Sequence, residues 1–298
     1  MSSRSGFVAL AGRPNVGKST LVNAMVGHKV AIVSDKPQTT RRAIRGVVTD
    51  GARPPRFQLV LTDLPGVQRP RDALTRRMQL RVETELAEAD AALLVLNGEQ
   101  GVGGPGDRFL AEALQGAGRP VVIALNKADR LDRGRTVAEL QAAADLGLDA
   151  EIFPVSARTG AGVQPLVDEL VGLVPEGPMY FPPDEVSDLP EDVRIAELVR
   201  EQVLRRTRQE LPHAVEVEVE EITAGEDVLT VRAYVWAETE SQKGILIGAR
   251  GRMVKAIGTA ARRELERELG TRVHLELSVR VRRSWRADDA LLDRLGIS

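Results

Sequence analysis

Short apolar runs alternate with amphipathic helical segments through the first half of this 298-residue chain. The apolar runs are typical of strands buried on both faces and occupy residues 7–10, 57–62, 91–96, 121–126 and 152–155. The helical segments between them occupy residues 18–26, 74–89, 108–116 and 165–171. Because parallel strands are joined through a crossover helix, this alternation predicts an α/β domain with a mostly parallel, helix-covered sheet. Residues 42–49 are expected to pair antiparallel with the 57–62 run at the sheet's edge.

The alternation ends in a proline-rich stretch, residues 174–192, in which no apolar period survives. Such a composition is typical of a linker. We therefore expect a first domain at residues 1–176, a linker that serves as a hinge at residues 177–191, and a second domain at residues 192–298. The second domain's pattern reads helix, strand, strand, helix, helix, strand, at residues 193–211, 215–219, 228–236, 240–247, 252–268 and 273–281. This order predicts a small α+β fold.

The composition supports two folded domains and argues against several kinds of site. Hydrophobic residues make up 43% of the chain, and the formal net charge is only −2. The chain has no cysteine, which rules out disulfides and thiolate metal sites, and its three histidines, His28, His213 and His274, are scattered. The N-terminus lacks a signal-peptide pattern, and no apolar run is long enough to span a bilayer. We expect a cytoplasmic protein, and nothing in the sequence requires more than a monomer.

Residues 12–19 fit the pattern G-x-x-x-x-G-K-[ST] between a predicted strand and a predicted helix. The glycines let the backbone turn tightly, so that its N–H groups and the helix N-terminus face a phosphate. Lys18 is expected to reach the outer phosphates, and the Ser19 hydroxyl to bind Mg²⁺. The nucleotide-binding residues predicted in this loop are Gly12, Arg13, Pro14, Asn15, Val16, Gly17, Lys18, Ser19 and Thr20.

A second motif, N-K-A-D at residues 126–129, follows a buried strand and favours guanine as the base. A carboxylate at Asp129 can accept from the ring N–H and the amine of guanine, whereas adenine has no such pair of donors. Asn126 is expected to hold the neighbouring loops, and Lys127 to pack its stem over the base. After the last strand, Ser156-Ala157 would present a backbone N–H to the guanine carbonyl. The predicted site also includes the next residue, Arg158.

The motif D-L-P-G, residues 63–66, supplies the rest of a GTP site. Asp63 ends a strand, where it can hold Mg²⁺ through water, and the Gly66 N–H can meet the γ-phosphate. Leu64 and Pro65 are included in the nucleotide-binding set. A threonine of the polar stretch 34–42 should reach Mg²⁺ only in the triphosphate state. We predict Thr40, with Thr39 as its competitor, so the residues expected to carry catalysis are Lys18, Thr40 and Gly66.

Val67 follows Gly66, at a position where many regulatory GTPases have a glutamine that orients water. Valine cannot orient water by hydrogen bonding, so we expect slow intrinsic turnover, roughly 10⁻⁴ to 10⁻² per second. Some other group must then supply the missing charge or water contact. One hypothesis is that the Asn15 side-chain carbonyl, with backbone oxygens of residues 34–42, holds a K⁺ ion.

These motifs together resemble the Era branch of small GTPases. In the first half the resemblance is carried by "GRPNVGKSTLVN", "KPQTTRR", "DLPG", "NKAD" and "SA". In the second half, "REQVLRRTRQELPHAVEVEVE" and "KGILIGARGRMVKAIGTAARRELE" resemble the KH domain of Era, and "RVRRSWRADDALLDRLG" resembles its tail. The resemblance covers about residues 7–296. It implies a P-loop GTPase domain followed by a type II KH domain.

In a KH fold the loop at residues 248–251 would join two helices and clamp the backbone of single-stranded nucleic acid. Charge supports this: residues 243–286 hold twelve Lys/Arg and four Asp/Glu, whereas residues 213–240 hold one and eight. Era proteins commonly have lysine and asparagine between the two glycines, where this chain has Ala249 and Arg250, so its phosphate contacts differ in detail. The predicted RNA-binding residues are Lys243, Gly248, Ala249, Arg250, Gly251, Arg252 and Lys255.

Two further groups of residues have two interpretations each. Trp285 would either stack on a base or anchor the tail at the protein surface. Three isoleucines near the loop would either line the groove for bases or belong to the core; they are Ile245, Ile247 and Ile257.

The resemblance implies a function in assembly of the small ribosomal subunit. It predicts that the KH domain binds near the 3′ end of the small-subunit (16S) ribosomal RNA, that GTP favours the RNA-competent domain packing, and that hydrolysis releases the factor from the 30S precursor. It also implies peripheral contact with the inner face of the cell membrane.

Other functions fit the residues less well. An RNA-binding module that uses nucleotide only for stability is the main alternative, and equal RNA affinity with GTP and GDP would favour it. A P-loop kinase has no use for "NKAD" or "DLPG". Related GTPases that modify tRNA rely on a C-terminal cysteine motif, and tandem-domain relatives need a second P-loop; this chain has neither.

Overall fold

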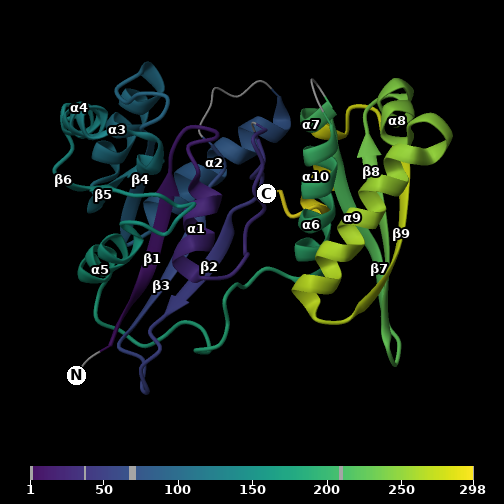
Figure 1. Ribbon diagram of the computed structural model, residues 1–298, viewed down its shortest axis with the longest axis horizontal. Helices are drawn as coiled ribbons and strands as arrows, with labels where there is room; N and C mark the ends of the chain where they lie inside the picture. Colours follow the sequence, from purple (N-terminus) through teal and green to yellow (C-terminus); the bar gives the residue numbers. More distant parts are fainter. Residues whose placement is uncertain (1–2, 37, 67–71, 208–210, 298) are drawn as a thin grey trace.

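A computed structural model describes residues 3–36, 38–66, 72–207 and 211–297 of the protein. These residues form two α/β bodies that lie side by side and are joined by an extended segment (Figure 1). Within them, the N-terminal body holds a six-stranded sheet and the C-terminal body a three-stranded one. Across the same ranges, no helix is both long and apolar enough to cross a membrane.

The apolar runs of the first half form the six-stranded sheet. Its strands, in spatial order, are β2 (Ile44–Thr49), β3 (Phe57–Asp63), β1 (Arg4–Ala11), β4 (Ala91–Asn97), β5 (Val121–Asn126) and β6 (Ala150–Pro154). All neighbours are parallel except β2 and β3, so the expected sheet and its edge hairpin are confirmed. The expected burial of residues 152–155 on both faces is met only in part: Ile152 and Phe153 pack half-buried against the two cores, and Val155, just past β6, is fully buried. No residue of β6 is buried, because this strand forms the edge of the sheet.

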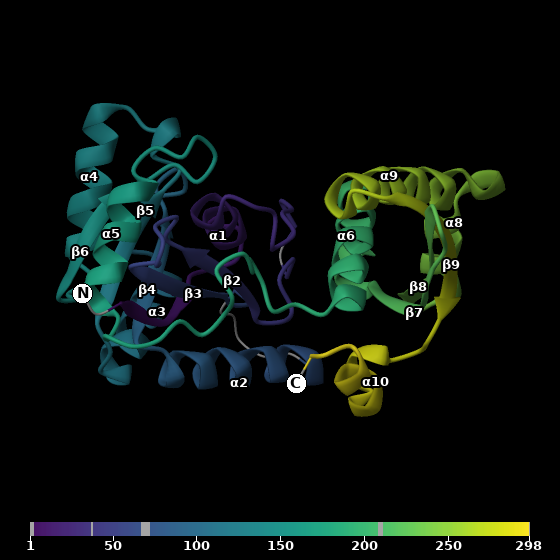
Figure 2. The ribbon, with the colours of Figure 1, turned by 90° about the horizontal axis from the view of Figure 1, so that it is seen from below.

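Helices cover both faces of this sheet (Figure 2). The first, α1 (Lys18–Val26), and the last, α5 (Val163–Leu173), pack on one face, whereas α2 (Ala73–Glu88) and α3 (Pro105–Ala117) pack on the other. These four match the helical segments of the sequence. The helix α4 (Arg133–Ala144) was not among the predicted segments. Its only buried side chain among the described residues is Ala143, so it carries almost no apolar pattern.

The C-terminal body has the predicted order of elements. Its sheet runs β7 (Glu216–Ala224), β8 (Val228–Ala237), β9 (Arg272–Val281), with β7 antiparallel and β9 parallel to β8. The helices are α6 (Glu191–Arg206), the short α7 (Leu211–Ala214), α8 (Glu240–Ile247) and α9 (Arg252–Leu269). Side chains of α6 and α9 pack into one core with the sheet.

The first of these helices is shorter than predicted. The prediction of a helix over residues 193–211 is wrong, because α6 ends at Arg206. Thr207 leaves the helical conformation (φ −107°, ψ 156°), and its hydroxyl donates to the Val203 carbonyl. Residues 208–210 lie outside the described ranges.

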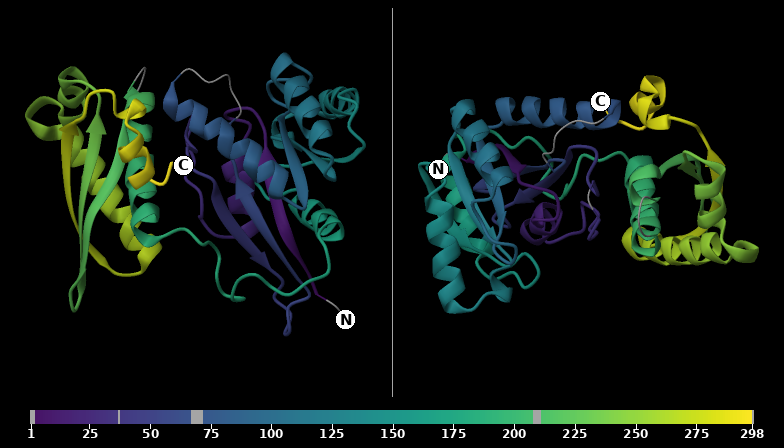
Figure 3. Two further views of the ribbon diagram at one scale, coloured as in Figure 1. Left: turned by 180° about the vertical axis from the view of Figure 1, so that it is seen from behind. Right: turned by 90° about the horizontal axis from the view of Figure 1, so that it is seen from above.

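The tail folds back from the C-terminal body onto the N-terminal one. The short helix α10 (Asp289–Arg294) lies beside α2 (Figures 2 and 3). Trp285 is fully buried, and its indole N–H donates to the Ala214 carbonyl at 2.9 Å. Its ring belongs to one apolar cluster with Leu74 and Met78 of α2 and with the tail's own leucines. A stacking role for Trp285 is therefore wrong; its side chain anchors the tail, although inside the protein rather than at its surface.

The proline-rich linker is attached to the N-terminal body for most of its length. The Gln58 side chain accepts the N–H groups of Tyr180 and Phe181 and donates to the Phe181 carbonyl. Farther along, the Val47 N–H donates to the Val186 carbonyl, and the Ser187 hydroxyl donates to the backbone of β2. The Asp188 carboxylate also lies 3.3 Å from Arg45 of β2, so contacts with the N-terminal body continue along the linker as far as Asp188.

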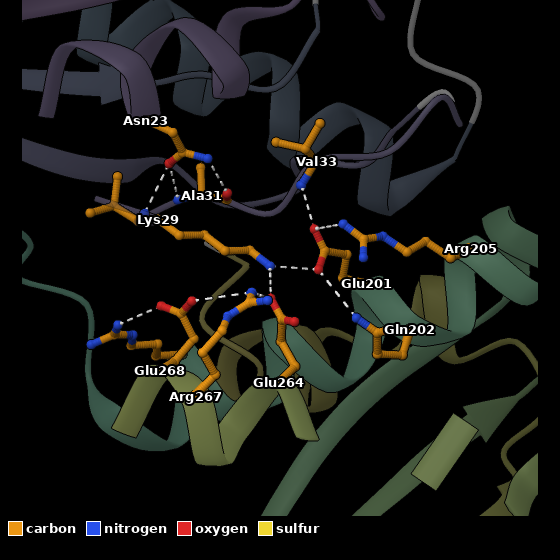
Figure 4. A network of polar contacts seen from close by, with 12 residues as sticks. Asn23, Lys29, Ala31, Val33, Glu201, Gln202, Arg205, Glu264, Arg267 and Glu268 are labelled. Carbon is orange, nitrogen blue, oxygen red and sulfur yellow. Dashed lines mark hydrogen bonds and ion pairs between the residues drawn. The ribbon is translucent and has the colours of Figure 1, made fainter. Parts of the chain in front are cut away.

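A polar network joins the two bodies beside α1 (Figure 4). Lys29, in the loop after α1, is held between the carboxylates of Glu201 (2.7 Å) and Glu264. Glu201 also accepts the Val33 N–H at 3.0 Å. Asn23 orders this loop, because its side-chain nitrogen donates to the Ala31 carbonyl and its side-chain oxygen accepts the Ala31 N–H. The loop that leads toward Thr40 is thus attached to α6 and α9 of the other body.

Candidate nucleotide-binding site and nucleic-acid interface

The phosphate loop joins β1 to α1 and lies against the end of β5. Gly17 has φ 99°, a conformation that favours glycine, and a Cβ atom there would lie 2.4 Å from Asn126 Nδ2. Asn126 donates to the Val16 carbonyl at 2.9 Å, which fixes the loop. The first N–H groups of an α-helix have no partner within the helix, so this end of α1 suits an anion.

Lys18 is buried under the loop and donates through Nζ to the carbonyl oxygens of Gly12 (3.0 Å) and Arg13 (3.2 Å). Burial lowers the pKa of Lys18 to about 8, and the nearby Asp63 carboxylate opposes this shift. A phosphate would favour the charged amine, because an opposite charge raises the pKa of a cation. The loop thus places a buried cation where an anion would stabilise it.

Three oxygen-bearing side chains from separate segments meet beside Lys18. Ser19 Oγ lies 2.6 Å from Asp63 Oδ2 and 3.0 Å from Thr40 Oγ1, and Thr40 Oγ1 lies 3.1 Å from the same carboxylate oxygen. Burial raises the pKa of Asp63, whereas the Lys18 charge and the two hydroxyls lower it. In the described part of the chain, Asp63 Oδ1 is buried without a hydrogen-bond partner. Mg²⁺ prefers such oxygen ligands, so the residues present fit it.

The hydroxyl of the competing threonine, Thr39, does not join these three side chains. The Thr39 hydroxyl donates to the Lys36 carbonyl at 2.7 Å. Asn15 reaches the same segment, since its Nδ2 donates to the Asp35 carbonyl at 3.0 Å. Gly66 lies close to the phosphate loop, because a Cβ atom there would come within 2.8 Å of Pro14.

One cavity unites the phosphate loop with residues 33–40 and Gly66. It is lined by Pro14, Asn15, Gly17, Lys18, Ser19, Thr20, Val33, Ser34, Gln38, Thr39, Thr40 and Gly66. Sequence reasoning missed Val33, Ser34 and Gln38, whose residue types give no signal in a loop. Two predicted residues, Val16 and Leu64, point into the apolar cores and offer only their backbone, and Pro65 is buried. Val67 lies outside the described residues.

The residues predicted to recognise the base lie at the ends of β5 and β6. Asn126 Oδ1 accepts the N–H groups of Lys127 (2.8 Å) and Ala157 (3.0 Å), so one side chain holds three loops together. Asp129 accepts from the Ser156 hydroxyl at 2.7 Å and from the Arg158 guanidinium at 2.7 Å. The Ser156 hydrogen bond lowers the pKa of Asp129, with the Arg158 charge adding to it, so this acceptor is ionised at neutral pH.

Three predicted contacts look different in detail. The Ser156 N–H donates to the Ala161 carbonyl and the Ala157 N–H to Asn126, so a guanine carbonyl would have to share the Ala157 N–H. The Arg13 side chain turns toward α3, where Nε lies 2.7 Å from the buried Asp107 carboxylate. Lys127 Nζ lies 3.4 Å from Glu99, a partner that no motif indicated.

The loop between α8 and α9 has the backbone of a tight clamp. Gly248 (φ 70°) and Gly251 (φ 74°) adopt conformations that favour glycine, and Arg250 (φ 54°) lies in the left-handed region between them. Arg250, Arg252 and the adjoining Ala249 are exposed. Lys255 is also exposed, whereas Lys243 is half-buried and lies 3.8 Å from Glu240.

A groove lies between α9 and β9. It is lined by Val254, Lys255, Gly258, Thr259, Arg262, Leu275 and Leu277. The strand leucines were not predicted, since their alternation in the sequence indicated only a strand. Of the three isoleucines, Ile257 belongs to the core, Ile245 is 51% exposed and Ile247 is half-buried. The groove thus combines apolar walls with two exposed cations, Lys255 and Arg262, that lie about two turns apart on α9.

Comparison with family models and curated proteins agrees with both halves of this architecture. A model described as a 50S ribosome-binding GTPase matches residues 7–127, and a KH-domain model matches residues 210–286. The chain is 44% identical to the GTPase Era of Mycobacterium sp. (strain KMS), and 45% identical to that of Mycobacterium avium (strain 104). Each match covers 98% of both chains.

Two solved structures share the whole fold. A variant of Aquifex aeolicus Era bound to GDP and AlF₄⁻ superposes with a TM-score of 0.94, and Era in complex with MgGDPNP and nucleotides 1506–1542 of 16S ribosomal RNA with a TM-score of 0.93. Each is 34% identical, and each match covers 99% of both chains. The predicted fold, a P-loop GTPase domain followed by a KH domain, is confirmed. The chain belongs to the Era family of GTPases, enzymes that hydrolyse GTP.

Proposed function

We propose that this chain is a GTP-dependent switch that binds the 3′ region of 16S ribosomal RNA through its KH domain and assists assembly of the 30S subunit and maturation of its RNA. The observation that carries the proposal is the meeting of Ser19, Thr40 and Asp63 beside a buried lysine, in a chain whose other half has an RNA-binding fold. We assign residues 1–176 to the GTPase domain, 177–191 to the linker and 192–298 to the KH domain.

In the GTPase domain, Lys18 and the N–H groups of the phosphate loop would hold the phosphates, and Gly66 would bond the γ-phosphate. Mg²⁺ would be held by Ser19 and Thr40 and, through water, by Asp63; when bound, it neutralises charge on the phosphates. The orphaned Asp63 Oδ1 supports this assignment. Thr40 is preferred to Thr39 because only its hydroxyl faces the other two ligands.

Guanine would be held by Asp129, with Asn126 fixing the surrounding loops, Lys127 packing on the ring, and Ala157 bonding the carbonyl. Asp129 is ionised and already accepts two hydrogen bonds on this edge, so it is suited to accept two from a base. Arg158 would move away from Asp129 as guanine binds.

Hydrolysis is expected to be slow without a further factor, because valine at position 67 cannot orient water. We propose that K⁺ binds between the Asn15 side-chain carbonyl and backbone oxygens of residues 34–42. The contact between Asn15 and the Asp35 carbonyl supports this, since it brings the two segments together. Measuring hydrolysis in K⁺ and Na⁺ buffers tests it, and equal rates would remove K⁺ from the mechanism.

RNA would bind across the loop at residues 248–251, with Arg250, Arg252 and Lys255 meeting phosphates and the α9–β9 groove taking bases. The exposed arginines in and beside the loop and the leucines of β9 in the groove support this division. The related Era structure with nucleotides 1506–1542 bound suggests the same RNA segment here. We further propose a monomer in the cytoplasm that contacts the inner face of the membrane peripherally.

Calorimetry with GTP, GDP and ATP tests the nucleotide site, and tight ATP binding would contradict it. Binding of an oligonucleotide matching the 16S 3′ end is then compared with GDPNP and with GDP on the protein. Tighter binding with GDPNP supports a switch, whereas equal affinities would show a constitutive RNA-binding module. Absence of binding in both states would contradict the RNA assignment.

A further inference from the structure

A cluster of five buried charged side chains lies where the two domains meet. Arg41 and Arg42 come from the loop before β2, Glu197 and Arg200 from α6, and Glu216 from the start of β7; each is no more than 6% exposed. We call this set the interface cluster. Its three arginines outnumber its two glutamates, and each arginine also donates to a backbone carbonyl, although Arg200 Nη1 is buried without a hydrogen-bond partner among the described residues.

The carbonyl bonded by Arg200 belongs to the residue just before the proposed Mg²⁺ ligand. Arg200 Nη2 donates to the Thr39 carbonyl and to Glu197 Oε2 (2.6 Å), and Nε lies 3.5 Å from Glu216 Oε1. Two carboxylates therefore fix the guanidinium, and the guanidinium fixes the backbone at Thr39. A fork with fixed donor directions suits such a task better than a flexible amine.

The residue after Thr40 is held by the same domain. Arg41 donates through Nη1 to the Val215 carbonyl (2.6 Å) and to Glu216 (2.8 Å). Thr40 is thus flanked on both sides by contacts with the KH domain, while its own hydroxyl faces Ser19 and Asp63.

From this geometry we infer that Arg200, a residue of the KH domain, is a positioning residue for binding of the triphosphate: it holds the Thr39 carbonyl so that the Thr40 hydroxyl faces the Mg²⁺ site. The inference rests on the proposed role of Thr40. Arg200 acts through the backbone and is not a catalytic residue, since it does not line the phosphate cavity. Because coupling between sites is reciprocal, GTP that engages Thr40 also favours the domain packing that the interface cluster stabilises.

The test compares affinities of the full-length protein for GDPNP and for GDP in the presence of Mg²⁺. Thr40 is expected to reach the metal only in the triphosphate state, so Arg200→Gln should weaken GDPNP binding about tenfold, as the loss of one charged hydrogen bond predicts, and leave GDP binding unchanged. Arg200→Lys keeps the charge without the fork and should lose a large part of the same selectivity. A thermal melt of each variant confirms folding, and if Arg200→Gln does not fold, Arg200→Lys carries the test.

Arg194→Gln is the matched control, because Arg194 also lies on α6 near the other domain, but its ion pair, with Glu268 at 3.3 Å, is made within the KH domain and does not touch residues 39–41. It should bind both nucleotides normally. A double-mutant cycle completes the test: if Arg200 acts through Thr40, then Arg200→Gln should cost no GDPNP affinity in a Thr40→Ala background.

Each outcome decides between the two claims. If Thr40→Ala itself shows no loss specific to GDPNP, the proposed role of Thr40 fails and the inference falls with it. The other outcomes apply when Thr40→Ala does show that loss. The role of Arg200 alone is overturned if Arg200→Gln lowers the affinities for GDPNP and GDP equally, or if its affinities equal those of Arg194→Gln. It is also overturned if the loss of GDPNP affinity in the double variant is the sum of the losses in the two single variants.

Discussion

The Asp129 carboxylate accepts a hydrogen bond from the Ser156 hydroxyl at 2.7 Å, so the residue proposed to read the base is itself oriented by the loop after β6. The second carboxylate oxygen faces Arg158, which is 70% exposed in its side chain and can move away. Asp129 thus combines a fixed position with an accessible edge.

Replacing Asp129 by asparagine should change base preference rather than simply abolish binding. The asparagine amide keeps one acceptor but has a donor in place of the other. This donor faces the exocyclic amine of guanine, which is also a donor, whereas xanthine has a carbonyl at the same place and can accept from it. We expect GTP affinity to fall about 10²-fold and xanthosine triphosphate affinity to rise, because an unpaired buried donor is costly. Calorimetry with both nucleotides measures this. Equal losses for the two bases would place the base elsewhere.

Salt dependence should show which cations touch RNA phosphates. Arg252 and Lys255 are exposed beside the loop at residues 248–251. Each one that contacts a phosphate should reduce the slope of log K against log salt by about 0.7 when it is changed to glutamine, as expected for single strands. Arg133→Gln, which removes an exposed cation from α4, is the control for net charge. A slope that stays the same in Arg252→Gln and Lys255→Gln would remove these residues from the RNA site.

Trp285 should stabilise the tail without taking part in RNA binding. Trp285→Phe loses the bond to the Ala214 carbonyl, and we expect about 1 kcal/mol less stability against urea, whereas Trp285→Ala should lose about 3–5 kcal/mol. Fluorescence in a Trp236→Phe background follows the buried indole directly. RNA affinity at saturating GDPNP should not change in Trp285→Phe; a large loss there would restore a stacking role.

The interface cluster should survive mild acid. Burial alone would raise the pKa of Glu216, but the charges of Arg42, Arg200 and Arg41 hold it well below the ordinary 4.5. A carboxyl with a lowered folded-state pKa contributes stability above its unfolded pKa and loses it as the pH falls toward the folded value. The difference in Tm between the native chain and Glu216→Gln should therefore be constant above about pH 5 and shrink below pH 4.5. A difference that grows on acidification would contradict this sign.

The parts of the site set by local geometry could be predicted from the sequence. The spacing of Gly12, Gly17, Lys18 and Ser19 predicts a loop whose conformation depends on adjacent residues. The strand before this loop and the helix after it could be predicted from the spacing of their apolar residues. The order of the KH elements could be predicted for the same reason. Even the choice of Thr40 over Thr39 agrees with the direction of the two hydroxyls.

What could not be predicted depends on contacts between distant segments. Nothing near Arg13 indicates that its partner is Asp107, and nothing near Arg41 indicates Glu216. The burial of Trp285 likewise depends on which surface the tail covers, a question of tertiary packing that residue periodicity does not address. Such pairs appear in the sequence only as isolated charges or a single aromatic residue.

The attachment of the linker to β2 and β3 limits how far the two domains can separate. If every contact across the interface were broken, only residues 189–190 would remain between Asp188, which pairs with Arg45 of β2, and the start of α6, a reach of roughly 10 Å. A tether of that length keeps the local concentration of one domain around the other very high, so re-docking would be fast and independent of protein concentration. The KH domain can therefore rotate about its attachment point, but it cannot search for a distant RNA on its own.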